Sequence, residues 1–156
     1  MAFPIRIIAF GRKSDILSDE VRHYLRLLKP YASAEIAILK PPAGQKAARK
    51  EQQSREYELM RARWPKRSYL VALSEEGRLQ DSRTYSKWIE KRMLSGVPLV
   101  FNIGSAHGLP VSVKDACDEI ISLSPLTLSH GISLIVLLEQ LYRAFTILKN
   151  HPYHKP

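Results

Sequence analysis

Residues 97–104, Val-Pro-Leu-Val-Phe-Asn-Ile-Gly, form an apolar run of strand length that leads directly into a glycine-containing loop. A short helix is predicted after that loop, over residues 113–117, and a further strand over residues 119–123. The order strand, loop, helix, strand is the unit from which α/β domains are built. This stretch therefore predicts an α/β fold with a mostly parallel sheet.

The same alternation continues outward to both ends of the chain. Ser18 is expected to cap a helix that ends before Pro30, and Gly96 to stop another. We expect one domain over residues 1–156, with ligands beyond the carboxyl ends of its strands. The other predicted elements are strands at 5–10, 34–39 and 68–73, a turn at 75–77, and helices at 19–28, 45–63, 84–95 and 133–149.

Composition limits the partners and the compartment. The chain has 156 residues, of which 24 are Lys or Arg and 15 Asp or Glu, so its net charge of +9 favours a polyanion such as nucleic acid. The single cysteine, Cys117, is expected to be a buried, inert thiol, as suits a reducing cytosol. No signal peptide is visible, and the apolar stretch 132–138 is far shorter than the roughly 20 residues of a membrane span. We expect a cytoplasmic protein that needs no membrane.

The last predicted helix, residues 133–149, is apolar around nearly its whole circumference. Such a helix must be buried on all sides, so we expect a second copy of the chain to cover it across a two-fold axis. The alternative is a central helix inside one chain. Glu139 and Arg143 are costly in this setting unless they are paired or used. The tail places two histidines and a tyrosine around Pro152, which is unusual for a dispensable terminus.

Common catalytic motifs are absent from the sequence. Residues 104–108 lack the Lys-Ser/Thr of a phosphate-binding loop, no three-glycine dinucleotide motif follows the first strand, and the histidines are too scattered for a metal site. A dinucleotide-dependent oxidoreductase is therefore excluded, and no metal is expected. Three features remain: the loop 104–108, the apolar loop 123–128, and residues 139–145 taken together with the tail.

Taken in order, these features resemble the RlmH family of SPOUT methyltransferases. The resemblance spans essentially the whole chain and is strongest in its last third. It implies a SPOUT-type sheet with a C-terminal trefoil knot, and a homodimer with two sites at its interface. The matching segments are Ile103-Gly104 with Gly108-Leu109, Leu123-Ser124 with Leu126-Thr127-Leu128, His130, Leu138-Glu139-Gln140-Leu141-Tyr142-Arg143-Ala144, and His151-Pro152-Tyr153-His154.

The resemblance also implies a cofactor and a substrate. The methyl donor is expected to be S-adenosylmethionine, and the target N3 of a pseudouridine in 23S rRNA of the assembled 70S ribosome. The residues expected to bind the donor are Leu73, Gly104, Leu123, Ser124, Pro125, Leu126, Thr127 and Leu128.

The catalytic candidates lie in the last helix and the tail. Tyr153 or His154 is expected to take the N3 proton, and Arg143 to stabilise the anion that develops on the uracil carbonyls. His130 is a secondary candidate. Each has a simpler reading: Arg143 as a partner of Glu139, His154 as a phosphate contact, and His130 as a hydrogen-bonding loop residue.

Two positions depart from the family pattern, Ser105 in place of a glycine and Leu134 in place of an arginine. They leave open a non-catalytic ribosome-binding factor with the same fold. A second alternative is a SPOUT enzyme that acts on another RNA, such as tRNA. In either case, the basic helix predicted at 45–63 is expected to attract phosphates without sequence preference.

Overall fold

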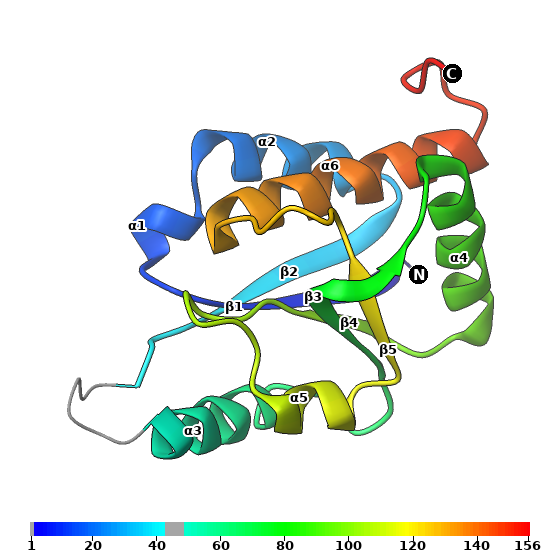
Figure 1. The fold of residues 1–156 in the computed structure, drawn as a ribbon. Coiled ribbons are helices and arrows are strands. Elements are labelled where there is room, and N and C mark those ends of the chain that lie inside the picture. The colour runs from blue at the N-terminus through cyan, green and yellow to red at the C-terminus, as the bar shows by residue number, and fades with distance from the viewer. Residues whose placement is uncertain (1, 43–48) are drawn as a thin grey trace.

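The computed structural model describes residues 2–42 and 49–156, which form a parallel sheet with helices on both faces (Figure 1). Every strand pairing is parallel, which confirms the predicted α/β class. The strand order is β2-β1-β4-β3-β5. The elements are β1 Phe3–Phe10, α1 Lys13–Ile16, α2 Asp19–Leu28, β2 Ala32–Leu39, α3 Arg49–Arg61, β3 Tyr69–Leu79, α4 Ser82–Ser95, β4 Leu99–Asn102, α5 Val111–Ala116, β5 Glu119–Ser122 and α6 His130–Leu148.

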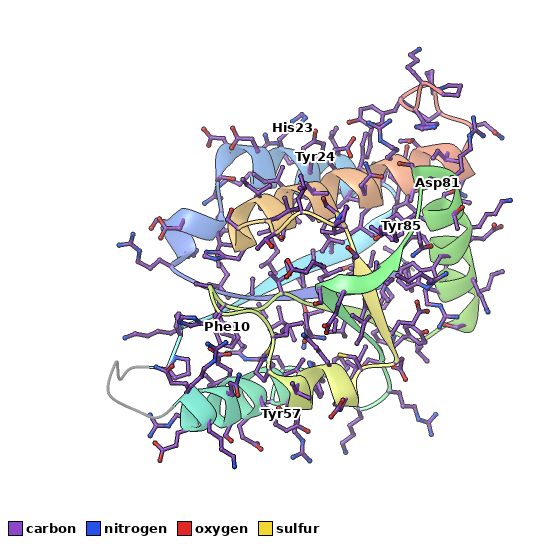
Figure 2. All side chains as sticks on the ribbon, viewed as in Figure 1. Phe10, His23, Tyr24, Tyr57, Asp81 and Tyr85 are labelled. Atoms are coloured by element: carbon purple, nitrogen blue, oxygen red, sulfur yellow. The ribbon has the colours of Figure 1, made fainter. Side chains whose placement is uncertain are left out.

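The helices divide into two layers. Helices α1, α2, α4 and α6 cover one face of the sheet, and α3 and α5 cover the other (Figure 1). Figure 2 accordingly shows Tyr24 of α2 and Tyr57 of α3 on opposite sides of the sheet. Each layer has its own apolar core; Phe101 and Phe145 lie in the larger core, and Met60 and Val113 in the smaller one.

Local signals set most helix ends. The Ser18 hydroxyl accepts a hydrogen bond from the Val21 amide at the start of α2, and Gly96 ends α4 in the left-handed conformation with φ 76°. Both predictions are confirmed. The predicted start of the middle helix at Gln45 lies outside the described residues, and α3 is described from Arg49. The short helix α1 was not predicted.

Strand β3 departs from the sequence prediction. Residues 75–77 were expected to form a turn, but the strand bends and continues to Leu79. Both Leu73 and Arg78 pair with Ile121, so the intervening residues bulge out and β3 meets β5 twice (Figure 1). Gly77 permits this approach, because a Cβ there would lie 2.7 Å from the Ile120 carbonyl group.

Helix α6 lies between α2 and α4 and packs on the sheet (Figure 1). Much of its apolar surface is therefore buried inside one chain, as in the alternative of a central helix, although Ile132 remains 52% exposed. The expectation about membrane length needs a correction, since α6 has 19 residues and is apolar enough to cross a membrane by length and composition. Its eight buried residues are typical of a core helix.

Candidate functional site

Three separate segments lie past the carboxyl ends of β4 and β5 and beside the bulge of β3. Leu73 pairs with Ile121 of β5, its neighbour Ala72 pairs with Asn102 of β4, and Gly104 follows β4 directly. The sheet therefore brings the expected donor-binding residues to one edge. We call Leu73, Gly104 and residues 123–128 the strand-end site.

The loop after β4 is closed by its own backbone. The Gly108 amide donates a hydrogen bond to the Ser105 carbonyl at 2.9 Å, and Gly108 has φ +80°. A Cβ on Gly104 would lie 2.5 Å from the Gly108 carbonyl carbon, so both glycines are required by the turn itself. The Ser105 hydroxyl donates to Glu56 at 3.0 Å and ties the loop to α3.

Residues 123–128 form a loop with few anchors. The Ser124 hydroxyl accepts from the Leu126 amide at 3.0 Å, and the Thr127 hydroxyl donates to Glu75 at 2.7 Å. Leu126 is 71% exposed, which is a high value for a large apolar side chain. The loop thus presents an apolar side chain that a flat ring could cover. Glu75, in the bend of β3, is an anchor that the sequence analysis missed.

A cavity of about 340 Å³ lies between the strand-end site and α6. Leu123 lines it on one side and Gln140 on the other. The Tyr85 hydroxyl and both amide atoms of Gln80 are buried along its wall, and no hydrogen-bond partner for them lies within the described residues. Figure 2 shows Tyr85 near the start of α4, beside α6. Unpartnered buried polar groups of this kind suit a ligand with its own donors and acceptors.

The tail folds back onto α6. The Arg143 guanidinium donates to Glu139 at 2.6 Å and to His154 Nδ1 at 3.0 Å, and the Tyr153 hydroxyl donates to Glu139 at 3.0 Å. The Tyr153 ring packs against Tyr142, with ring centroids 4.6 Å apart. We call Glu139, Arg143, Tyr153 and His154 the C-terminal cluster. The structure thus brings together the catalytic candidates Arg143, Tyr153 and His154. Arg143 also pairs with Glu139, as in the simpler reading of this residue.

The environment of the cluster sets the proton positions. Burial, together with hydrogen bonds to Tyr24 and Glu139, raises the pKa of Tyr153 well above its ordinary value. The hydrogen bond to Glu139 raises the pKa of Arg143. Tyr153 therefore acts as a hydrogen-bond donor near neutral pH. Because arginine only donates, His154 Nδ1 must be the acceptor in its bond with Arg143.

The strand-end site and the C-terminal cluster do not touch in one chain. His130, two residues after the site, is about 20 Å from Arg143 along α6 at 1.5 Å per residue. Gln140, which bonds to Glu139, lies nearer and lines the same cavity as Leu123. No hydrogen bond or ion pair joins the two groups within residues 2–42 and 49–156. His130 is the first residue of α6, so the reading of it as a loop residue is wrong.

Three further expectations concern Leu134, metal-binding side chains and Cys117. Leu134 is 1% exposed in the core, and no group of three metal-binding side chains occurs in the described parts of the chain. Burial raises the pKa of the Cys117 thiol to about 12, in keeping with an inert cysteine.

The sequence of this chain is also similar to those of known proteins. Residues 3–154 match the family described as predicted SPOUT methyltransferase. A protein of Syntrophomonas wolfei named ribosomal RNA large subunit methyltransferase H is 40% identical over 96% of this chain and 98% of its own. A protein of the same name from Halothermothrix orenii is 36% identical over 97% and 99% of the two chains. These matches confirm the resemblance, and the chain belongs to the RlmH family of SPOUT methyltransferases.

Proposed function

We propose that this protein methylates large-subunit ribosomal RNA, at N3 of a pseudouridine in 23S rRNA of the assembled 70S ribosome. The observation that carries the proposal is the convergence of three segments at one sheet edge, in a chain whose full-length relatives are named as large-subunit methyltransferases. The net charge of +9 suits an RNA substrate. We further propose that the enzyme acts in the cytoplasm.

The proposed donor is S-adenosylmethionine, which supplies a methyl group made electrophilic by a sulfonium charge. Leu73, Gly104 and residues 123–128 would hold it. Leu126 is exposed, Leu73 and Leu128 are half-buried, and together they offer an apolar surface to an adenine ring. The adjoining cavity offers the unpartnered groups of Gln80 and Tyr85 to polar atoms. The residues present therefore fit a ligand that is part aromatic and part polar.

The C-terminal cluster suggests how the N3 proton is removed. In the free protein, His154 Nδ1 is engaged by Arg143. We propose that a uracil carbonyl takes the place of His154 as the acceptor for Arg143. His154 Nδ1 is then free to take the proton from N3, while the cation of Arg143 stabilises the resulting anion. Tyr153 remains protonated and orients Glu139.

A second copy of the chain is part of this proposal. Within residues 2–42 and 49–156, no hydrogen bond or ion pair joins the strand-end site to the C-terminal cluster of the same chain. Ile132 is half-exposed on α6 and would be covered by a partner. A homodimer in which the tail of one subunit serves the donor of the other reconciles both observations. The C-terminal trefoil knot belongs to the same proposal.

The test is transfer of labelled methyl from S-adenosylmethionine to ribosomes from a strain lacking this gene. Intact 70S particles, free subunits and bulk tRNA are compared, and mass spectrometry locates the label. Label on one pseudouridine of 23S rRNA in 70S particles alone supports the proposal. Label on tRNA would overturn the substrate and leave the fold and donor. Donor binding without any transfer would support a non-catalytic ribosome-binding factor instead.

A further inference from the structure

A second pocket lies on the outer side of α4, at the β5 edge of the sheet, and the mechanism above does not use it. Its volume is about 340 Å³. Helix α4 forms one wall, and the bent end of β3 and the edge strand β5 form the other (Figure 1). The lining residues are Tyr69, Arg78, Gln80, Thr84, Lys87, Trp88, Lys91, Arg92 and Glu119.

The pocket carries four cations and one carboxylate. The carboxylate of Glu119 is already engaged, since it accepts from Tyr69 at 2.6 Å and from Trp88 and Arg78 at 2.8 Å each. Lys87 and Lys91 are exposed and one helical turn apart, where like charges destabilise a helix. Neither lysine has a carboxylate within salt-bridge distance in the described residues. An anion between them would remove this cost.

The inner wall of the pocket is formed by side chains that are packed in place. The Arg92 guanidinium lies 3.9 Å from the centroid of the Tyr69 ring, and its Nε is buried without a hydrogen-bond partner among the described residues. Trp88 is only 7% exposed and forms part of the wall. An arginine fixed on an aromatic ring, with an unused donor, is suited to an oxygen of a phosphate.

Charge also singles out this side of the molecule. Helix α3 has four basic and three acidic residues, and therefore little net charge. Helix α4 has four basic residues and one acidic residue. Helix α4 therefore carries more net positive charge than α3 as described, whereas the whole segment 45–63 of the sequence prediction, with six basic and three acidic residues, matches it.

We propose that this pocket binds a backbone phosphate of the RNA substrate. The identity of the polyanion as RNA rests on the function proposed above. The pocket also adjoins the reaction site, because Gln80 lines both this pocket and the cavity next to Leu123. A phosphate held here therefore fixes the strand close to the methyl donor.

The experiment compares two double variants with the same loss of charge. Lys87→Gln with Lys91→Gln removes two cations from the pocket, and Arg49→Gln with Lys50→Gln removes two exposed cations from α3. Binding to 70S ribosomes and to protein-free 23S rRNA is measured as a function of salt. We expect the α4 pair to weaken binding about tenfold near 0.1 M salt, and to reduce the logarithmic salt slope by roughly 0.7–0.9, the value for one phosphate. The α3 pair should change affinity far less, and donor binding should be unchanged in both.

Equal losses in the two variants would overturn the proposal, because net charge alone would then explain them. So would a loss on ribosomes without a loss on protein-free rRNA, since the pocket would then face an acidic protein. These binding measurements do not depend on catalysis. If the wild-type protein transferred no methyl group and the α4 pair still lost RNA affinity, the function proposed above would fail and the phosphate pocket would stand.

Discussion

The strand-end site and the C-terminal cluster are built in opposite ways. The strand-end site consists mostly of backbone and apolar side chains, with Leu126 open to solvent and few anchors, such as the hydrogen bond from Thr127 to Glu75. In the C-terminal cluster, the polar side chains bond to one another, and Glu139 alone accepts from Arg143, Tyr153 and Gln140. The first region leaves an apolar side chain open to solvent, whereas the polar side chains of the second are already hydrogen-bonded to one another.

The largest expected effect separates binding from chemistry. His154→Ala and the double change Tyr153→Ala with His154→Ala should lower the rate of methyl transfer about 10²–10⁴-fold, the usual contribution of a positioned acid or base. Donor affinity, measured by calorimetry, should stay the same because the strand-end site is untouched. Lys155→Ala is the control from the same tail. Turnover near the wild-type rate in the double variant would remove the tail from the mechanism.

Replacing Gly104 should affect the other region alone. In Gly104→Ala, the new methyl group would lie 2.5 Å from the Gly108 backbone, so the loop must rearrange. We expect a loss of about 1–3 kcal/mol in unfolding free energy and a weaker donor affinity. The matched control is Gly131→Ala, where nothing lies within 4 Å and a small gain is expected. Equal behaviour of the two variants in urea unfolding would contradict the tight loop.

A smaller effect is expected from the anchor between the bend of β3 and the loop 123–128. Thr127→Val keeps the shape of the side chain and removes the hydrogen bond to Glu75. Donor affinity should fall a few-fold, consistent with about 0.5–1.5 kcal/mol for one hydrogen bond. Glu75→Gln keeps an acceptor and should bind nearly normally. If donor titration finds Thr127→Val unchanged, the anchor does not shape the site.

The smallest effect concerns alkaline stability of the cluster. The pKa of Tyr153 is raised in the folded protein, chiefly by burial, so the unfolded chain loses this proton first, near pH 10. Below that pH the contribution of Tyr153 to the free energy of unfolding is constant. Above that pH the free energy of unfolding falls as the pH rises. Tyr153→Phe should therefore show a shallower loss between pH 9 and 11 in urea unfolding. A steeper loss in the variant would mean that the phenol is not buried as described.

Local chemistry explains what the sequence could predict. The caps at Ser18 and Gly96 and the apolar strands follow from short-range patterns, and those patterns produced the correct sheet. The bend of β3 was missed because it depends on the approach of Gly77 to Ile120, far along the chain. Residues 75–77, with two acids and a glycine, look like a turn when read alone.

The strand-end site and the C-terminal cluster also differed in how much of each could be predicted from the sequence. The pattern of parallel strands predicted a ligand site beyond their carboxyl ends, and the family resemblance supplied Leu73, Gly104 and residues 123–128 as its members. The pairings of β3 with β4 and β5 place Leu73 next to both strands. The cavity with Gln80 and Tyr85 was not predicted, since these residues face it only after α4 packs beside α6. The unusual tail composition indicated a role for Tyr153 and His154, but the pattern gave no sign of their bonds to Glu139 and Arg143.

The position of α6 also has a consequence for biosynthesis. This helix supplies a large part of the main core, and it follows every other described helix and strand along the chain. A chain that is cut short before it would expose the apolar faces of α2, α4 and the sheet together. Premature termination would therefore give a product for chaperones and proteases, not a folded but inactive competitor for ribosomes.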